Sequence, residues 1–129
     1  MPLGAFSVSL TVKDIAASVD FYQTLGFDLF HDGREHNYAI LKNGEAVIGL
    51  FQGMFDQNIM TFNPGWSQDA SAIEGDFEDV REIQARLQDA GIEMINPAEP
   101  DGTGPASFMI SDPDGNTILF DQHVDRPSS

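Results

Sequence analysis

Few side chains in this sequence are of the kinds that bind metals or transfer protons. The 129 residues include three histidines, His31, His36 and His123, and no cysteine. The absence of cysteine excludes disulfides, thiolate metal sites and a cysteine nucleophile. No two histidines have a spacing that would bring them together as ligands on one helix or strand. We therefore interpret all three as surface or rim residues.

Aromatic side chains that could hold a ligand are concentrated in one segment, residues 51–66. It contains Phe51, Phe55, Phe62 and Trp66, the only tryptophan of the chain, and it follows neither helical nor strand periodicity. Aromatic rings bury a large apolar area and can stack on planar or cationic molecules. We expect some of these residues to line a binding site, or else to pack along a module junction or a dimer interface.

The charge of the chain limits its partners. It has 21 acidic and six basic residues, which gives a net charge of −15 at pH 7. Such a surface repels phosphate backbones and anionic lipids, so we expect neither nucleic acid nor a membrane as partner. The same charge attracts cationic ligands, although solubility alone would also explain it.

Two further features of the sequence bear on its location. No apolar run approaches the roughly 20 residues that a membrane-spanning helix needs. The first residues lack the basic start and long apolar stretch of a signal peptide. We therefore expect a cytoplasmic protein.

An internal repeat predicts the elements that position these residues. Asp14 and Asp79 each precede an apolar stripe at helical spacing, and Gly26 and Gly91 follow twelve residues later. This pattern predicts two matching helices. Segments with strand-like patterns surround each helix. The predicted strands are 6–12, 27–31, 37–41 and 46–51 in the first half, and 72–77, 93–96, 106–111 and 117–122 in the second.

The resulting βαβββ order, repeated once, defines the predicted organisation. We expect an α+β fold in one domain over residues 1–129. Module one covers about 4–52, a linker about 53–70, and module two about 71–124. Asp114-Gly115 is a turn signal, and we interpret Asp112 beside it as a hairpin residue rather than a catalytic carboxylate.

Three parts of the sequence match the patterns of a known family: an opening strand and helix, the end of the first module, and a characteristic turn. They are Val12-Lys13-Asp14 with Phe21-Tyr22 and Leu25-Gly26-Phe27, then Asn43-Gly44 with Val47 to Phe51, then Ser111-Asp112-Pro113-Asp114-Gly115-Asn116. On these residues the chain resembles the glyoxalase/bleomycin resistance protein/dioxygenase (vicinal oxygen chelate) superfamily. The resemblance implies paired modules that form a curved mixed sheet with an open bowl. In that bowl four inward side chains, usually His and Glu, bind a divalent metal.

The four positions at which the resemblance places metal ligands carry Ser7, Gly49, Ala72 and Leu119. Divalent ions in such sites prefer imidazole and carboxylate ligands. A register error of one residue at each position brings in no better ligand. We therefore expect no metal and no cofactor. The family's metal-dependent glyoxalase, fosfomycin-transferase and extradiol-dioxygenase reactions should be absent.

The implied bowl also suggests which residues contact a ligand. Besides the aromatic residues of 51–66, we expect Ser7, Ser9 and Leu119 to face it. Glu74 and Asp121 are candidate catalytic residues, because a carboxylate held beside apolar walls can act as a proton acceptor.

Three functions remain open. The first is a metal-independent protein that binds a small, cationic or planar molecule, in the manner of the sequestering bleomycin-resistance type. The second is a glyoxalase-like lyase or isomerase with a carboxylate base. The third is a structural or regulatory dimer with no small ligand. The resemblance alone leads us to expect a homodimer.

Overall fold

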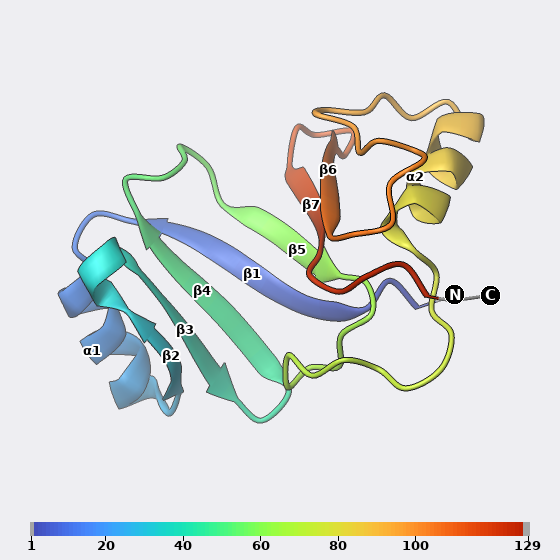
Figure 1. Cartoon of the computed structure of the whole chain (residues 1–129). Helices are drawn as coiled ribbons and strands as arrows, with labels where there is room; N and C mark the ends of the chain where they lie inside the picture. The colour runs from blue at the N-terminus through green and yellow to red at the C-terminus, as the bar shows by residue number, and fades with distance from the viewer. Residues whose placement is uncertain (1, 128–129) are drawn as a thin grey trace. The chain divides into compact units, whose positions relative to one another are not determined.

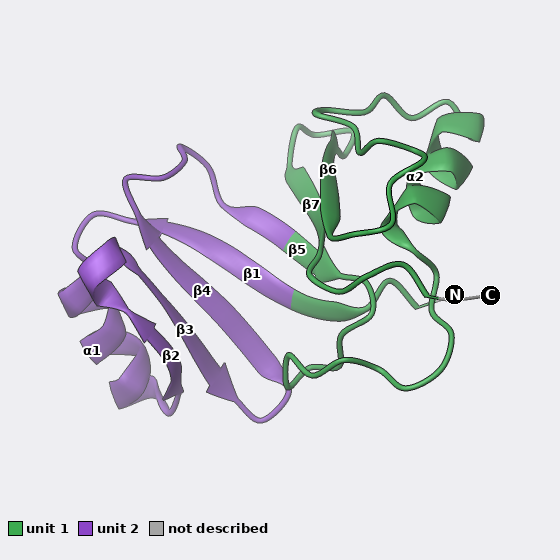
Figure 2. Cartoon of the chain, viewed as in Figure 1, with its two compact units in different colours: residues 1–6, 61–129 green, residues 7–60 purple. Residues whose placement is uncertain are grey.

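The computed structural model describes residues 2–127. The chain forms two compact units (Figure 2). Unit 2 is Ser7–Met60, and unit 1 combines Met1–Phe6 with Thr61–Ser129. Among the described residues, no helix is both long and apolar enough to cross a membrane.

The described strands form one mixed sheet (Figure 1), with the hydrogen-bonded order β2-β3-β4-β1-β5-β7-β6. Strands β1 and β5 each have residues in both units (Figure 2). The mixed sheet and the two α-helices confirm the predicted α+β fold class. The bounds are β1 (Ala5–Val12), α1 (Ile15–Leu25), β2 (Asp28–Gly33), the short 3-10 helix η1 (Arg34–His36), β3 (Tyr38–Asn43), β4 (Ala46–Gln52), β5 (Ile59–Asn63), α2 (Val80–Asp89), β6 (Ala106–Ser111) and β7 (Thr117–Gln122).

In unit 2, helix α1 covers one face of the strands. The Asp14 carboxylate accepts a hydrogen bond from the Ala17 N–H at 3.2 Å, and Gly26 ends the helix at φ 124°. Apolar side chains of α1, β3 and β4 form the core. Because side chains alternate along a strand, the neighbours of these core residues point to the face opposite α1. The buried core residues are Ile15, Val19, Ala39, Leu41 and Leu50.

In unit 1, helix α2 packs on β6 and β7 through a second core. The helix begins at a fully buried carboxylate, Asp79, which accepts hydrogen bonds from the Arg81 N–H at 3.0 Å and from Gln122 Nε2 at 2.7 Å. Arg81 Nη1 lies 3.1 Å from the same carboxylate. This network fixes α2 to β7. The buried core residues are Val80, Ile83, Phe108, Ile110 and Phe120.

Two of the predicted strands are wrong. Residues 72–77 form no strand, and only Ala72 makes an isolated bridge, to Trp66. Ala70 (φ 59°) and Gly75 (φ 88°) have left-handed backbones, which interrupt extended structure there. The strand before α2 is instead β5, inside the predicted linker. Residues 93–96 likewise make only one bridge, from Ile95 to Met109. The module boundaries themselves stay a prediction.

Candidate functional site

A row of four aromatic side chains lies on the face of unit 2 opposite α1; we call it the aromatic ladder. It consists of His31, Tyr38, Phe51 and Phe55. His31 stacks on Tyr38 with ring centroids 5.5 Å apart, and Tyr38 stacks on Phe51 at 6.1 Å and an interplanar angle of 12°. Phe51 meets Phe55 at 5.3 Å. The ladder therefore offers apolar ring surface beside a polar end at His31.

The sheet register brings the ladder together. Tyr38 on β3 is directly opposite Phe51 on β4, and aromatic pairs in such positions stabilise a sheet. An irregularity between Leu29 and His31 shifts the register of β2, so that His31 lies opposite Ile40. His31 Nε2 and the Tyr38 hydroxyl are then 2.8 Å apart, within hydrogen-bond distance.

The last member of the ladder is held by the opening strand. The Thr11 hydroxyl donates to the Phe55 carbonyl at 2.9 Å, and the Thr11 N–H donates to Asn58 Oδ1 at 3.0 Å. These bonds fix the loop after β4. Phe55 is half-buried in this position, as are Tyr38 and Phe51.

Two glycines make room for the rings. A Cβ at Gly49 would come within 2.6 Å of Phe51 Cε2, and a Cβ at Gly33 would collide with the Tyr38 ring. A glycine inside a strand often marks such a close approach. Gly49 is also the second position at which the family resemblance places a metal ligand. A side chain could be presented there only if the Phe51 ring moved away.

The other implied metal positions do not fit a divalent ion either. Ser7 is half-buried on β1, Ala72 is exposed, and Leu119 lies on β7. Strand β5, which replaces the predicted strand at 72–77, has no His, Asp or Glu between Ile59 and Asn63. Within residues 2–127, no group of three or more His, Cys, Asp or Glu side chains could hold a metal ion. The donor set of this chain is therefore poorly matched to the family's metal.

A second candidate group of side chains lies in unit 1. His123 Nε2 is 3.2 Å from Asp121 Oδ2, and the His123 ring stacks on Trp66 with centroids 4.5 Å apart and planes 18° apart. The hydrogen bond to Asp121 raises the pKa of His123 above its ordinary value, and this outweighs the opposing effect of burial. The His123 and Asp121 side chains are 46% and 36% exposed, so small molecules can reach them.

Local bonds hold this group in place. Trp66 follows β5 in a turn closed by its N–H, which donates to the Asn63 carbonyl at 3.1 Å. Asn63 Nδ2 in turn donates to the Asp121 carbonyl at 2.8 Å. His123 is exposed, as expected from the sequence, but the sequence interpretation did not identify it as a candidate functional residue. The signal was its spacing of two residues from Asp121, which continues one face of a strand.

The remaining predicted site residues lie elsewhere. Glu74 is exposed in the loop before α2 and forms no hydrogen bond or ion pair with the part of the chain that is described. Phe62 stacks on Phe120 at 5.6 Å and joins the core of unit 1. Ser9 is buried on β1 beside Gly49 in register. Of the predicted site residues, Phe51 and Phe55 are therefore in contact. Asp121 and Trp66 are linked indirectly, because His123 contacts both of them.

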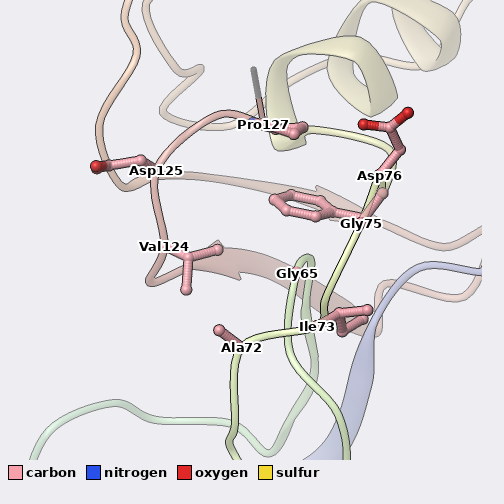
Figure 3. Close-up of a pocket in the computed structure, with 9 residues that line it drawn as sticks. Gly65, Ala72, Ile73, Gly75, Asp76, Val124, Asp125 and Pro127 are labelled. Atoms are coloured by element: carbon pink, nitrogen blue, oxygen red, sulfur yellow. The ribbon is translucent and has the colours of Figure 1, made fainter. Parts of the chain in front are cut away.

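A hollow of about 340 Å³ lies next to Ala72 in unit 1 (Figure 3). Ile73, Phe77 and Val124 give it apolar walls. The carboxylates of Asp76 and Asp125, on its rim, point away from it (Figure 3). The hollow therefore carries no converging polar groups that would orient a substrate.

One protein-family model matches most of the chain: that of the glyoxalase/bleomycin resistance protein/dioxygenase superfamily, over residues 4–120. A superfamily member from Vibrio splendidus 12B01 has 17% identity and a TM-score of 0.62, over 91% of this chain and 97% of that one. A structure described as a NAD-dependent benzaldehyde dehydrogenase from Legionella pneumophila has 20% identity and a TM-score of 0.66, over 92% and 98%.

A third similar structure is a homoprotocatechuate 2,3-dioxygenase from Brevibacterium fuscum with bound 3,4-dihydroxyphenylacetate. It has 20% identity and a TM-score of 0.59 over 95% of this chain, but only 37% of the dioxygenase chain is covered. At these identities the likeness concerns the fold alone. Comparison with curated proteins finds no match.

Proposed function

The chain belongs to the glyoxalase/bleomycin resistance protein/dioxygenase superfamily, and from this premise we propose that it is a metal-independent member that binds a planar small molecule on the aromatic ladder. The observation that carries the proposal is the close approach of the Phe51 ring edge to Gly49. Where the family resemblance implies a metal-binding side chain, this protein presents an aromatic ring.

The ladder has the properties of a stacking surface. Tyr38 and Phe51 are nearly parallel, at 12°, and neither ring is fully buried. A planar ligand that stacks on such rings gains about 0.5–1.5 kcal/mol per aromatic pair beyond the apolar area it buries. The hydroxyl of Tyr38 and the imidazole of His31 add polar groups at one end, which can orient a ligand.

The charge of the protein favours a cation among planar ligands. The net charge of −15 raises the local concentration of cations near the surface. Aromatic faces attract cations as well, since the π-system is negative above the ring. A planar cation therefore satisfies both the shape and the electrostatics of the ladder.

Fluorescence titration with two planar probes tests this function. We expect ethidium, a planar cation, to bind more tightly than 1-pyrenesulfonate, a planar anion. Phe51→Leu should weaken ethidium binding roughly fivefold, which corresponds to about 1 kcal/mol. Phe21→Leu is the matched control, because the Phe21 ring is 64% exposed on α1, outside the ladder. Equal loss in both variants would contradict the proposal.

The metal-independent part needs its own measurement. Ethidium affinity should be the same for protein treated with EDTA and for protein supplied with Zn²⁺, Mg²⁺ or Ni²⁺. Isothermal titration with each ion alone should give no stoichiometric binding. A tightly bound ion, or affinity that depends on one, would overturn this part. The expected homodimer and the cytoplasmic location stay predictions.

A further inference from the structure

We propose that His123 is a general base that removes a proton from a small carbon acid, with Asp121 as the residue that positions it. The proposal goes beyond ligand binding on the aromatic ladder and rests on residues of unit 1 alone. It also changes the role of Asp121, which the sequence suggested as the base itself.

The geometry assigns the roles within the pair. Asp121 Oδ2 lies 3.2 Å from Nε2 of His123, so the carboxylate favours the neutral imidazole that carries its proton on Nε2. Nδ1 is then the basic nitrogen. Within residues 2–127, Nδ1 has no hydrogen-bond partner. A carboxylate that fixes the tautomer and orientation of an imidazole is a recurring feature of histidine bases.

Trp66 supports the same role from the face of the ring. The indole and imidazole centroids are 4.5 Å apart and the planes are 18° apart. Stacking fixes the imidazole plane, and the indole face stabilises the positive charge that forms when Nδ1 accepts a proton. Trp66 therefore holds the imidazole of His123 in its orientation and stabilises the imidazolium that proton transfer produces.

The electrostatic surroundings strengthen His123 as a base. The hydrogen bond to Asp121 raises the pKa of His123, while burial lowers it. The other charged groups in the neighbouring segments are Asp125 and Arg126, after His123, Asp69, after Trp66, and Glu74 and Asp76, in the segment that Ala72 bridges to Trp66. A stronger base accepts a proton from carbon more readily, as long as it is still unprotonated at the working pH.

The reaction class follows from these groups and balances without a further reactant. A C–H bond next to an electron-withdrawing group breaks, and its proton moves to Nδ1. The electron pair stays on the substrate, where it forms a new π bond or expels a leaving group. His123 then returns the proton to another atom of the product or to water. Isomerisation and elimination both fit this scheme.

The elimination of 5-nitrobenzisoxazole provides a direct test. Its C3–H proton goes to the base, the C–H electron pair completes a nitrile, and the N–O bond breaks to give 2-cyano-4-nitrophenolate, which absorbs in the visible range. We expect His123→Gln to lower kcat/KM at least about tenfold. His36→Gln is the matched control, because His36 also lies near a carboxylate, Glu35, at 3.7 Å, but is 73% exposed. It should change the rate less than twofold.

The pH profile separates a positioned base from a merely exposed histidine. The rate should rise with one ionisation, and Asp121→Asn should move its midpoint to lower pH. The fluorescence of Trp66 should titrate with the same midpoint, because a protonated imidazole quenches a stacked indole. His123→Gln should abolish the fluorescence titration in a protein that still folds. Asp125→Asn should change neither profile by as much as Asp121→Asn.

Three results would overturn the proposal. The first is a rate in His123→Gln within twofold of the unaltered protein. The second is a rate profile whose midpoint differs from that of Trp66 fluorescence. The third is an unchanged midpoint in Asp121→Asn. None of these depends on ethidium binding, so this proposal and the proposed function can fail separately.

Discussion

The ring of Phe51 lies so close to Gly49, two residues before it on the same strand, that a Cβ at Gly49 would be 2.6 Å from Phe51 Cε2 and 3.1 Å from Cζ. Strand geometry places both residues on one face of the sheet. The lack of a side chain at Gly49 and the position of the ring therefore depend on each other.

Gly49→Ala should disturb this pair. The new methyl group displaces the Phe51 ring, and we expect the free energy of unfolding to fall by about 1–3 kcal/mol in urea denaturation. Gly104→Ala is the control, since a Cβ there meets nothing within 4 Å. The double variant Gly49→Ala/Phe51→Ala should lose less than the sum of the single changes, because the clash is gone. Additive losses would contradict the proposed contact.

The buried Asp79–Arg81 pair should dominate the stability of unit 1. Asp79→Asn leaves the Arg81 guanidinium, which is 4% exposed, without its charged partner. We expect a loss of about 3 kcal/mol or more in the free energy of unfolding. Asp32→Asn, which breaks the half-exposed Asp32–Arg34 pair, should leave that free energy nearly unchanged. Urea denaturation at pH 7 measures the free energy of unfolding of both variants.

The lowered pKa of Asp79 predicts that the folded protein loses stability at acid pH. Burial alone would raise the pKa of Asp79, but hydrogen bonds from Gln122 and Arg81 and the charge of Arg81 lower it below 3.8. A lowered pKa in the folded state adds stability above the unfolded value, and this is lost as the pH falls through the folded value. Stability should therefore drop below about pH 4, and the drop should be smaller in Asp79→Asn.

Most of the fold could be predicted from local patterns. The Asp caps at Asp14 and Asp79 and the apolar stripes after them are strong helix signals, and both helices begin one residue after the cap. The strands that pack on the helices could also be predicted, because apolar residues that face the core alternate with other residues along them. Strand β5 was missed because Ile59-Met60-Thr61-Phe62 lies among aromatic residues without a clear period.

The candidate site was less predictable, because it depends on pairings between distant segments. The sequence identified Phe51 and Phe55 from their composition, but Tyr38 and His31 join them only through the register of β2 and β3. Trp66 and His123 are far apart in sequence and meet through a loop whose course no periodicity indicates. Phe62 has the same residue type as Phe55, yet it belongs to a core.

The Asp121–His123 pair should make stability depend on pH near neutrality. Asp121 raises the pKa of His123 above 6.5 in the folded protein. The stabilisation is therefore complete below about pH 6.5, the unfolded value, and is lost as the pH rises through the folded value. We expect the Tm to fall between pH 5.5 and pH 8.5 by more in the unaltered protein than in Asp121→Asn. Glu35→Gln should leave that difference unchanged, and equal falls in all three proteins would contradict the coupling.

Phe55 and Phe62 provide the sharpest separation of binding from packing, because both lie in the aromatic segment and differ only in their neighbours. Phe62 stacks on Phe120 within the core of unit 1, whereas Phe55 ends the ladder of unit 2. Phe62→Leu should lower the free energy of unfolding by about 1–2 kcal/mol and leave the ethidium Kd within twofold. Phe55→Leu should raise that Kd severalfold with a smaller loss of stability, because its ring lies in a loop and belongs to neither hydrophobic core. If Phe62→Leu weakened ethidium binding more than Phe55→Leu, the ladder would not be the binding surface.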